Sequence, residues 1–452
     1  MAEADLDAVL ATVRDRVTPD ADERAHLESV AETALERARA AVDARDVAAT
    51  VLLVGSASRD TWLPGERDVD VFVAVPPSLD RATLESFGLA VGHATLDGGE
   101  EAYAEHPYVT GVLDGVDVDV VPCYAVAEAA DSQSAVDRTP FHAAYVEDRL
   151  DESLAAEVRV VKQFLVAIGS YGSDLRTRGF SGYLTELLVL EYGDARGVLE
   201  AVADWPTRVR LDPAGHGAVE FDDPLVVVDP TDPARNVAAV CSAERVARLQ
   251  HHARSVLEAP RVEAWFPPPR EPLDAEAVAA HVRARGTTPV ALVFEAPDLL
   301  DDELYPQLRK SLAGVGDALD RLGFETLRRA TFANDRAVLL FELAVPTLPA
   351  VERHEGPPVA VREHAEAFYA RYADDPTVYG PFVDGGRYVV EREREWPTAV
   401  SYLESDALFE ARLGPAVDAA LGRGYELVTG ESLATLAEEF GHELADYFEP
   451  AP

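Results

Sequence analysis

The sequence predicts a multidomain protein of mixed α/β (α+β) class. At 452 residues the chain is long for a single hydrophobic core, so we expect two to four domains. Strand-like alternation dominates the first part of the chain, and helical spacing of apolar residues begins near residue 150. A second region of mixed strands and helices follows residue 270.

The first 150 residues predict a long helix and then a sheet. The helix spans residues 19–44, with Thr18 as its cap and Pro19 in its first turn. Apolar runs that follow predict strands, with one helix between the second strand and the third. The strands are expected at residues 49–54, 69–75 and 116–121, and the helix at residues 80–97.

The remaining chain predicts a helical region, a linker and a second α/β region. Helices are expected at residues 153–168, 181–193 and 242–258, with a loop-rich insert at 204–236 and a proline-rich linker from Trp265 to Pro272. Beyond the linker, strands are expected at 288–295, 324–331, 336–345 and 387–394, and helices at 302–322, 360–373 and over much of the last fifty residues.

The charge balance is strongly acidic. Asp and Glu number 82 against 40 Lys and Arg, which gives a formal net charge of -42, and only Lys162 and Lys310 are lysines. Carboxylates dispersed in this way are typical of halophilic proteins, because they keep the surface hydrated in concentrated salt; an acidic protein from a GC-rich genome is the alternative. Such a chain repels nucleic acid at long range, so an RNA partner requires local basic patches.

The cysteines and the hydropathy pattern bear on the compartment. Cys123 and Cys241 lie in apolar surroundings and predict buried thiols rather than a disulfide framework or a zinc site. No apolar run approaches the length that crosses a membrane, and the N-terminus lacks the layout of a signal peptide. We therefore expect a soluble cytoplasmic protein with no membrane partner.

The segment from Gly55 to Val73 carries the sharpest functional pattern. A strand ends just before Gly55 and Ser56, which predict a tight turn into a short helix. Glycine allows close approach of the backbone, and the serine hydroxyl lies beside unpaired helix amides, as in a phosphate-binding loop. Arg59 follows one turn later and can add a positive charge.

Alternating carboxylates follow on the next predicted strand. Asp68 and Asp70 are two residues apart, so they point to one face about 7 Å apart. Asp119, with Asp117 beside it, supplies a third carboxylate from a later strand. Three carboxylates can hold two Mg²⁺ ions about 4 Å apart, which activate a hydroxyl and stabilise a leaving pyrophosphate. A lone Asp-x-Asp is a common surface pattern, but this combination predicts nucleotidyl transfer.

Longer motifs resemble a known family. The chain is similar to the class I, archaeal-type CCA-adding enzymes (tRNA nucleotidyltransferases) and, more distantly, to poly(A) polymerases and the DNA polymerase β superfamily. The resemblance covers the chain to about residue 240, with scattered agreement such as LYPQL later. The motifs that carry it are GSASRDTWLPGERDVDVFV, VDVDVVPCY, DRTPFH, YGSDLRTRGFSGYLTELL and DPARNVAA.

The resemblance implies Mg²⁺ and a set of metal ligands. These are Asp68, Asp70 and Asp119, which would also be the catalytic residues. Asp68 stands where the family usually has Glu, and this shorter carboxylate should still bind the metal. Ala57 replaces a family Tyr, which casts little doubt on phosphate binding.

The resemblance also implies nucleotide contacts and substrates. His142 would lie near the nucleotide, Lys162 and Tyr171 would contact the triphosphate, and Arg235 would face the incoming base; Ser56 and Arg59 would hold the phosphates. Taken alone, His142 and Tyr171 suit core positions and Lys162 suits a solvated helix face. The substrates implied are CTP, ATP and tRNA, and the enzyme would add CCA to the tRNA 3′ end without a nucleic-acid template.

The family organisation implies a polymerase-β-like head, a helical neck, an α/β body, a tail, and commonly a homodimer. The expected ranges are 1–149 for the catalytic head, 150–268 for the nucleotide-contacting neck, 269–325 and 396–452 for the body, and 326–395 for a tRNA-binding tail.

Two parts of the distal chain could contact RNA. Six basic residues lie between Arg309 and Arg336, where they could bind tRNA phosphates or pair with local acids. Aromatic residues and arginines mix at residues 360–394, where stacking on RNA competes with core packing as an explanation.

Other functions stay open at this stage. The same chemistry could serve a poly(A)-type polymerase, an oligoadenylate synthetase or a transferase that modifies a small molecule. A catalytically silent RNA-binding scaffold is a further alternative. Degenerate carboxylates would indicate the scaffold, but Asp68, Asp70 and Asp119 are all present.

Overall fold

The computed structural model describes residues 5–103 and 105–452. The chain divides into two compact units, and the division falls between Pro268 and Pro269, inside the predicted linker. We call them unit 1 and unit 2. Trp265, at the start of that linker, is buried in the core of unit 1. Among the residues described, no helix is long and apolar enough to span a membrane.

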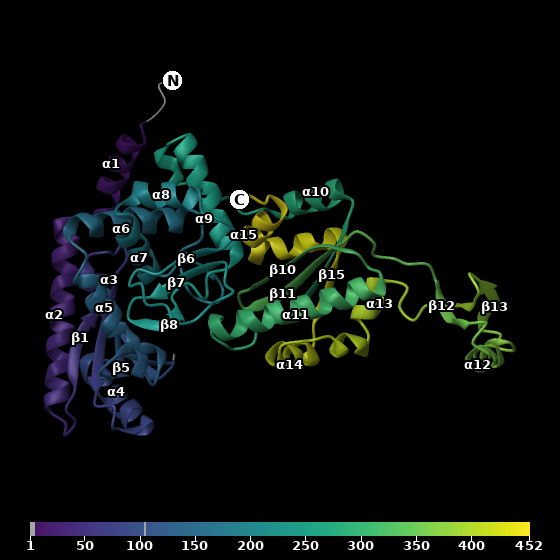
Figure 1. Ribbon diagram of the computed structural model, residues 1–452, viewed down its shortest axis with the longest axis horizontal. Helices are drawn as coiled ribbons and strands as arrows, with labels where there is room; N and C mark the ends of the chain where they lie inside the picture. The colour runs from purple at the N-terminus through teal and green to yellow at the C-terminus, as the bar shows by residue number, and fades with distance from the viewer. Residues whose placement is uncertain (1–4, 104) are drawn as a thin grey trace. The chain divides into compact units, whose positions relative to one another are not determined.

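A five-stranded mixed sheet forms the head of unit 1 (Figure 1). Its order is β1-β2-β5-β4-β3, with β2 parallel to β5 and the other neighbours antiparallel. The strands are β1 (Thr50–Val54), β2 (Asp68–Val75), β3 (Glu100–Tyr103), β4 (Pro107–Leu113) and β5 (Val116–Tyr124), and the helices are α2 (Ala21–Asp43), α3 (Gly55–Arg59), α4 (Arg81–Thr95) and α5 (Thr139–Glu147).

The two faces of this sheet have different partners. Val71 and Val73 of β2 pack in one cluster with residues of α2 and α4. Phe72 and Ala74 point the other way and pack with Ala143 of α5. Because side chains alternate along a strand, Asp68 and Asp70 share the face of Phe72, away from α2 and α4.

The neck of unit 1 is mainly helical. Its core includes Phe164 and Trp265, whose ring centroids lie 5.1 Å apart. A small sheet of order β6-β7-β8 lies in the insert that we predicted to be loop-rich. The elements are α6 (Glu152–Ala167), α7 (Gly182–Tyr192), α8 (Ala195–Ala203), β6 (Val209–Leu211), β7 (Leu225–Asp229), β8 (Asp232–Asn236) and α9 (Ala243–Glu258). The N-terminal helix α1 (Leu6–Val17) packs in the same core, although it lies in the range 1–149 that we predicted for the head.

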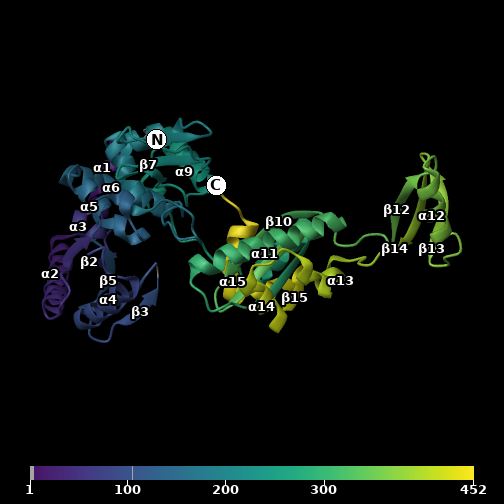
Figure 2. The same ribbon diagram turned by 60° about the horizontal axis from the view of Figure 1, so that its bottom comes forward.

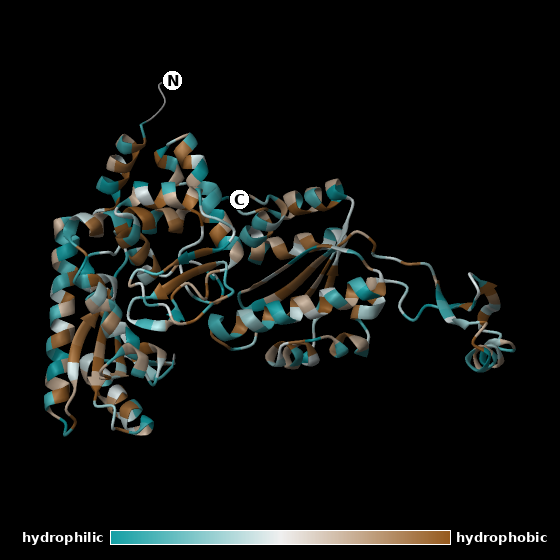
Figure 3. Ribbon diagram, in the orientation of Figure 1, coloured by the Kyte–Doolittle hydropathy of each residue, from teal (hydrophilic) through white to brown (hydrophobic). Residues whose placement is uncertain are grey.

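A four-stranded antiparallel sheet is the centre of unit 2, with order β10-β11-β9-β15. Figure 3 shows its long strands as strongly hydrophobic, because both faces are covered. Leu339 and Phe341 pack with α11 and α14, whereas Val338 and Leu340 pack with α10 and α15. The elements are α10 (Ala275–Arg285), β9 (Thr288–Glu295), α11 (Asp301–Leu322), β10 (Thr326–Ala333), β11 (Arg336–Leu343), α13 (Ala399–Leu403), α14 (Pro415–Arg423), β15 (Glu426–Thr429) and α15 (Ala437–Phe448).

A small three-stranded sheet with one helix forms a separate part of unit 2 (Figure 2). Its strand order is β12-β14-β13. The elements are β12 (Val351–Pro358), α12 (Arg362–Tyr372), β13 (Val378–Asp384) and β14 (Arg387–Glu393). The predicted tail range of 326–395 therefore includes β10 and β11, which instead pair with β9 in the larger sheet.

The structure confirms most of the predicted elements and corrects several. The long N-terminal helix begins at Ala21 with Asp20 as its cap, and Thr18 instead ends α1, a helix that we did not predict. The insert at 204–236 contains three short strands rather than only loops. The strands β3, β4, β12, β13 and β15 were not predicted either. Three of them, β3, β12 and β13, are largely exposed and lack strong apolar alternation.

The carboxylate of Glu342 on β11 is buried in unit 2 and joins three elements. Arg285 Nε and Nη2 donate to its two oxygens at 2.6 and 2.9 Å, and the Tyr447 hydroxyl donates at 2.9 Å. Removing one partner of a buried pair leaves the other charge uncompensated. We therefore expect Glu342→Ala to lower the free energy of unfolding of unit 2 by about 3 kcal/mol.

Denaturant unfolding of the full chain in concentrated salt measures this loss. Glu295→Ala, at an exposed end of the neighbouring β9, is the matched control and should change stability little. Equal effects of the two substitutions would contradict a structural role for the buried pair.

Candidate active site

The predicted carboxylates meet where β2 and β5 pair. The two strands are parallel, and their register places Asp68 opposite Asp117 and Asp70 opposite Asp119. These four side chains line a cavity of about 340 Å³, which we call the carboxylate pocket. Its other lining residues are Ser56, Glu66, Val69, Lys162 and Tyr171.

Crowded like charges define the electrostatics of the carboxylate pocket. Burial, followed by the charges of Asp119 and Asp68, raises the pKa of Asp70 to about 6. Burial also raises the pKa of Asp68 and of Asp119, and neighbouring carboxylates add to both effects. Carboxylates in this arrangement resist ionisation unless a cation joins them.

Hard cations suit these donors, because Mg²⁺ prefers carboxylate oxygens. Asp68, Asp70 and Asp119 project from adjacent strands into one polar cavity, which fits a set of metal ligands. As the side chains lie, no three acidic, imidazole or thiol groups in the described part of the chain are close enough to hold one ion. The fit therefore rests on the clustering and chemistry of the donors.

Gly55 sits against the most buried of these carboxylates. Its φ is +75°, a conformation that favours glycine. A Cβ atom at this position would collide with Oδ2 of Asp70. The turn from β1 into α3 therefore requires glycine, and it brings Ser56 into the lining of the pocket, as the sequence predicted.

Lys162 reaches the carboxylate pocket from the neck. This residue of α6 is 4% exposed, and its Nζ donates to Oε2 of Glu66. The same nitrogen lies 5.1 Å from the ring centroid of Tyr171. The structure thus brings Lys162 and Tyr171 to the pocket with Ser56, and it adds Glu66, which we did not predict.

The side chain of Arg59 is bound by a carboxylate outside the carboxylate pocket. It is absent from the lining of the carboxylate pocket, and its Nε donates to Oε1 of Glu186 on α7 at 2.9 Å. Thr61 donates to the same oxygen at 2.9 Å. Arg59 is nevertheless close enough that its charge lowers the pKa of Asp70, opposing burial.

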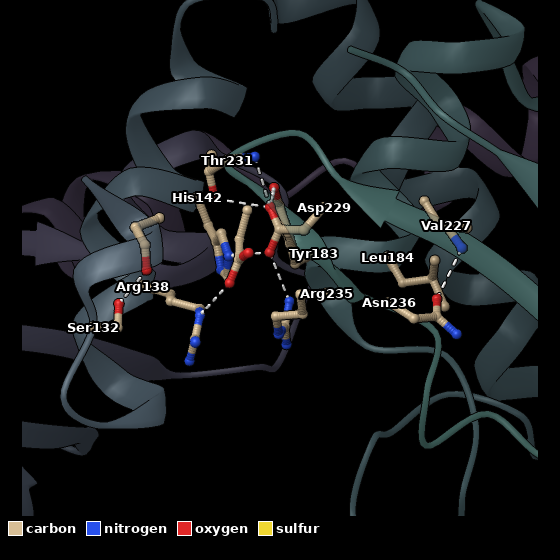
Figure 4. A network of polar contacts seen from close by, with 12 residues as sticks. Ser132, Arg138, His142, Tyr183, Leu184, Val227, Asp229, Thr231, Arg235 and Asn236 are labelled. Atoms are coloured by element: carbon tan, nitrogen blue, oxygen red, sulfur yellow. Dashed lines mark hydrogen bonds and ion pairs between the residues drawn. The ribbon is translucent and has the colours of Figure 1, made fainter. Parts of the chain in front are cut away.

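His142 and Arg235 meet in a second polar cluster, shown in Figure 4. Both contact Oδ2 of Asp229, His142 through Nε2 at 2.8 Å and Arg235 through Nη1 at 2.8 Å. Tyr183 stacks on His142, with ring centroids 4.1 Å apart and planes 14° apart. We call Asp229, His142, Tyr183, Thr231 and Arg235 the Asp229 cluster.

Sequence reasoning missed Glu66, Glu186 and Asp229. In this acidic chain most carboxylates are solvated, so another Asp or Glu carries little information. Glu186 does interrupt an apolar helix, and Asp229 ends the apolar run of β7. A charged residue within or directly after such a segment is the signal that could have identified both.

Acidic residues form ion pairs with some of the arginines in the predicted basic stretch. Arg329 pairs with Asp317 and Asp320, and Arg336 pairs with Glu439. These contacts support the alternative that the arginines serve local ion pairs. In the small sheet, Tyr372 is 7% exposed whereas Tyr379 is 68% exposed, so core packing explains only some of the aromatic residues. The remaining exposed rings keep RNA contact as a prediction.

The crowding in the pocket predicts a stabilising substitution. The pKa of Asp70, about 6, lies above the ordinary value of 3.8, so its contribution to stability is present at low pH and is lost as pH rises through about 6. Asp70→Asn removes the free-energy cost of keeping this carboxylate ionised in the folded protein. In chelator we expect it to stabilise the protein by roughly 1–2 kcal/mol at about pH 7.5, and less at about pH 4.5.

Thermal melting in concentrated salt measures the gain. Asp97→Asn, in an exposed turn, is the control and should be neutral. A destabilising effect of Asp70→Asn at neutral pH would contradict the proposed electrostatic strain.

Comparisons with known proteins cover nearly the whole chain. Family models match as a nucleotidyltransferase domain at residues 35–142, a tRNA nucleotidyltransferase second domain at 156–266, and a CCA-adding enzyme C-terminal domain at 285–430. The first match confirms the predicted nucleotidyltransferase fold of the head.

Three relatives carry the same name. The CCA-adding enzyme of Haloarcula marismortui is 57% identical and that of Halorubrum lacusprofundi 53%, each over 99% of this chain and over 99% and 100% of the relative. The CCA-adding enzyme of Methanoregula boonei is 41% identical over 96% of this chain and 93% of the relative. These matches confirm the family predicted from the motifs: the chain belongs to the CCA-adding enzymes, and it is a tRNA nucleotidyltransferase.

Proposed function

We propose that the carboxylate pocket adds the 3′-terminal CCA to tRNA from CTP and ATP, without a nucleic-acid template. The observation that carries this proposal is the meeting of Asp68, Asp70 and Asp119 with Ser56 and Lys162 in one pocket. Family membership over the full chain supports tRNA as the acceptor.

The three aspartates are proposed as the ligands of Mg²⁺. Bound there, the metal would supply activation of the RNA 3′-hydroxyl and stabilisation of the leaving pyrophosphate. The protein contributes the geometry, because parallel pairing of β2 with β5 fixes Asp70 opposite Asp119. Asp68, one pleat away, keeps a carboxylate on the same face despite its shorter side chain.

Ser56, Lys162 and Tyr171 are proposed to bind the triphosphate. Ser56 offers a hydroxyl, and Lys162 offers a buried positive charge in the lining of the same pocket. Lys162 is held by Glu66 in this structure, so binding of the triphosphate requires it to exchange a carboxylate for a phosphate oxygen. Arg59, anchored on Glu186, is proposed to act as a nearby positive charge.

His142 and Arg235 are proposed to contact the nucleotide away from the metal ligands. Arg235 is 37% exposed at its side chain, although the carboxylate that anchors it is fully buried. An arginine held at one nitrogen and partly exposed is suited to donate hydrogen bonds to a base.

Domain roles follow the same family. We propose residues 1–149 as the catalytic head, 150–268 as the neck, and residues 269–452 as the body and tail. The small sheet from Val351 to Glu393 is proposed as the part of the tail that contacts tRNA. The net charge of -42 fits a halophilic protein. A cytoplasmic location and a homodimer stay predictions, and light scattering in concentrated salt tests the dimer.

Nucleotide incorporation tests the activity directly. We expect two C residues and then one A on tRNA transcripts that lack CCA, with Mg²⁺ and molar potassium chloride. Asp70→Ala should lower incorporation by at least about a thousandfold, because it removes a metal ligand, whereas Asp97→Ala in an exposed turn should retain activity.

Each contrary outcome points to a different alternative. Long A tracts would transfer the assignment to a poly(A)-type polymerase. Equal use of UTP or GTP would contradict CCA addition. No addition at any salt concentration would favour the silent scaffold.

The two lysines of the chain provide a matched pair for triphosphate binding. Lys162→Gln removes the buried positive charge, so we expect the KM for CTP and ATP to rise by about tenfold or more. Lys310→Gln removes an exposed charge and should leave KM unchanged. Steady-state kinetics measure both substitutions, with CTP on tRNA ending in a single C and with ATP on tRNA ending in two C residues. An unchanged KM in Lys162→Gln would remove Lys162 from the site.

A further inference from the structure

The carboxylate of Asp229 is fully buried and saturated with hydrogen bonds. Oδ2 is shared by His142 of the head and Arg235 of the neck. Oδ1 accepts from the backbone N–H of Thr231 at 2.9 Å and from its hydroxyl at 2.8 Å, with the Tyr183 hydroxyl at 3.4 Å. Figure 4 shows these donors converging on the one carboxylate.

The carboxylate of Asp229 is held as an anion. Burial raises its pKa, but hydrogen bonds from His142 and Thr231 outweigh burial and keep the pKa of Asp229 well below its usual range. Hydrogen bonds to an ionised acceptor are shorter and stronger than neutral ones. Asp229 therefore anchors its partners firmly, and it does so from a position with 0% exposure, where it cannot touch a ligand itself.

Arg235 needs such an anchor. Its long side chain extends from β8, a five-residue strand, and is 37% exposed. The contact with Asp229 uses Nη1, which restrains one end of the guanidinium while the side chain stays 37% exposed. Because arginine can only donate hydrogen bonds, the direction in which its free N–H groups point decides which base edges it can match.

We propose that Asp229 is a positioning residue that aims Arg235 at the incoming base and thereby sets the selectivity for C and A. Cytosine and adenine both present a ring-nitrogen acceptor beside an exocyclic amine, whereas uracil and guanine present a ring N–H beside a carbonyl. A donor held in one position can form a hydrogen bond with the ring acceptor of cytosine or adenine. A donor that is free to move can instead form one with the carbonyl of uracil or guanine. This inference rests on the proposed function.

Asp229→Asn is the first test. Asparagine keeps the shape but has one acceptor oxygen, so an N–H₂ group must face either Thr231 or the pair His142 and Arg235. We expect the KM for CTP and ATP to rise by about tenfold, with a smaller change in kcat, and the preference for CTP over UTP to fall by a similar factor. Single-nucleotide incorporation provides these values, with CTP or UTP on tRNA lacking CCA and with ATP on tRNA ending in two C residues.

A double-mutant comparison separates positioning from general damage. Arg235→Ala removes the group that Asp229 is proposed to aim, so adding Asp229→Asn to it should cost no further selectivity. Asp222→Asn is the matched control, because it makes the same substitution at a carboxylate that is 99% exposed and lies outside the Asp229 cluster. Its selectivity should equal that of the unaltered chain.

Several outcomes would overturn the proposal. Unchanged selectivity in Asp229→Asn, or a selectivity loss that adds fully to that of Arg235→Ala, would show that Asp229 does not act through Arg235. If Asp229→Asn fails to fold by thermal melting, Asp229→Glu keeps the charge and displaces it by one methylene. A folded Asp229→Glu with unchanged KM and selectivity would also overturn the proposal.

Failure of the proposed function is a separate result. It would appear in the unaltered chain, as no addition of C and A to tRNA. The positioning proposal fails only when the unaltered chain is selective and Asp229 proves irrelevant to that selectivity.

Discussion

Crowding of carboxylates on one parallel strand pair is the constraint on which the rest of the head depends. Asp70 and Asp119 face each other because β2 runs parallel to β5 in this register, and burial prevents water from screening them. The opposite face of the same strands packs against α2 and α4, which fixes the backbone beneath the charges. Repulsion between these carboxylates thus raises the free energy of the folded head, and a bound cation would reduce that repulsion.

The neck supplies the compensating groups. Lys162 is buried against the pocket, and Glu186 and Asp229 are buried carboxylates that hold arginines at the boundary of head and neck. Each of these charges belongs to an ion pair between different segments of the chain, so the position of one group depends on the other.

Strong net charge changes how arginines should be interpreted. In a chain with a net charge of -42, a local excess of positive residues attracts acidic residues of the same chain. Arg329 shows this by pairing with two aspartates. We therefore expect nucleic-acid contact in such a protein to depend on arginines whose anchors leave part of the guanidinium exposed, and on exposed rings such as Tyr379. Short-range contacts of this kind persist in concentrated salt, where long-range attraction is screened.

The sequence by itself determined the class of the fold, most elements, the family, and the central carboxylates. Alternation in β2 and β5 and the glycine before Ser56 are local patterns, so Asp68, Asp70 and Asp119 could be chosen without coordinates. Only the tertiary structure decided that Arg59 and Arg235 are anchored on Glu186 and Asp229. Those contacts join residues on different elements, and burial, which gives such carboxylates their strength, is a property of the assembled core rather than of any short segment.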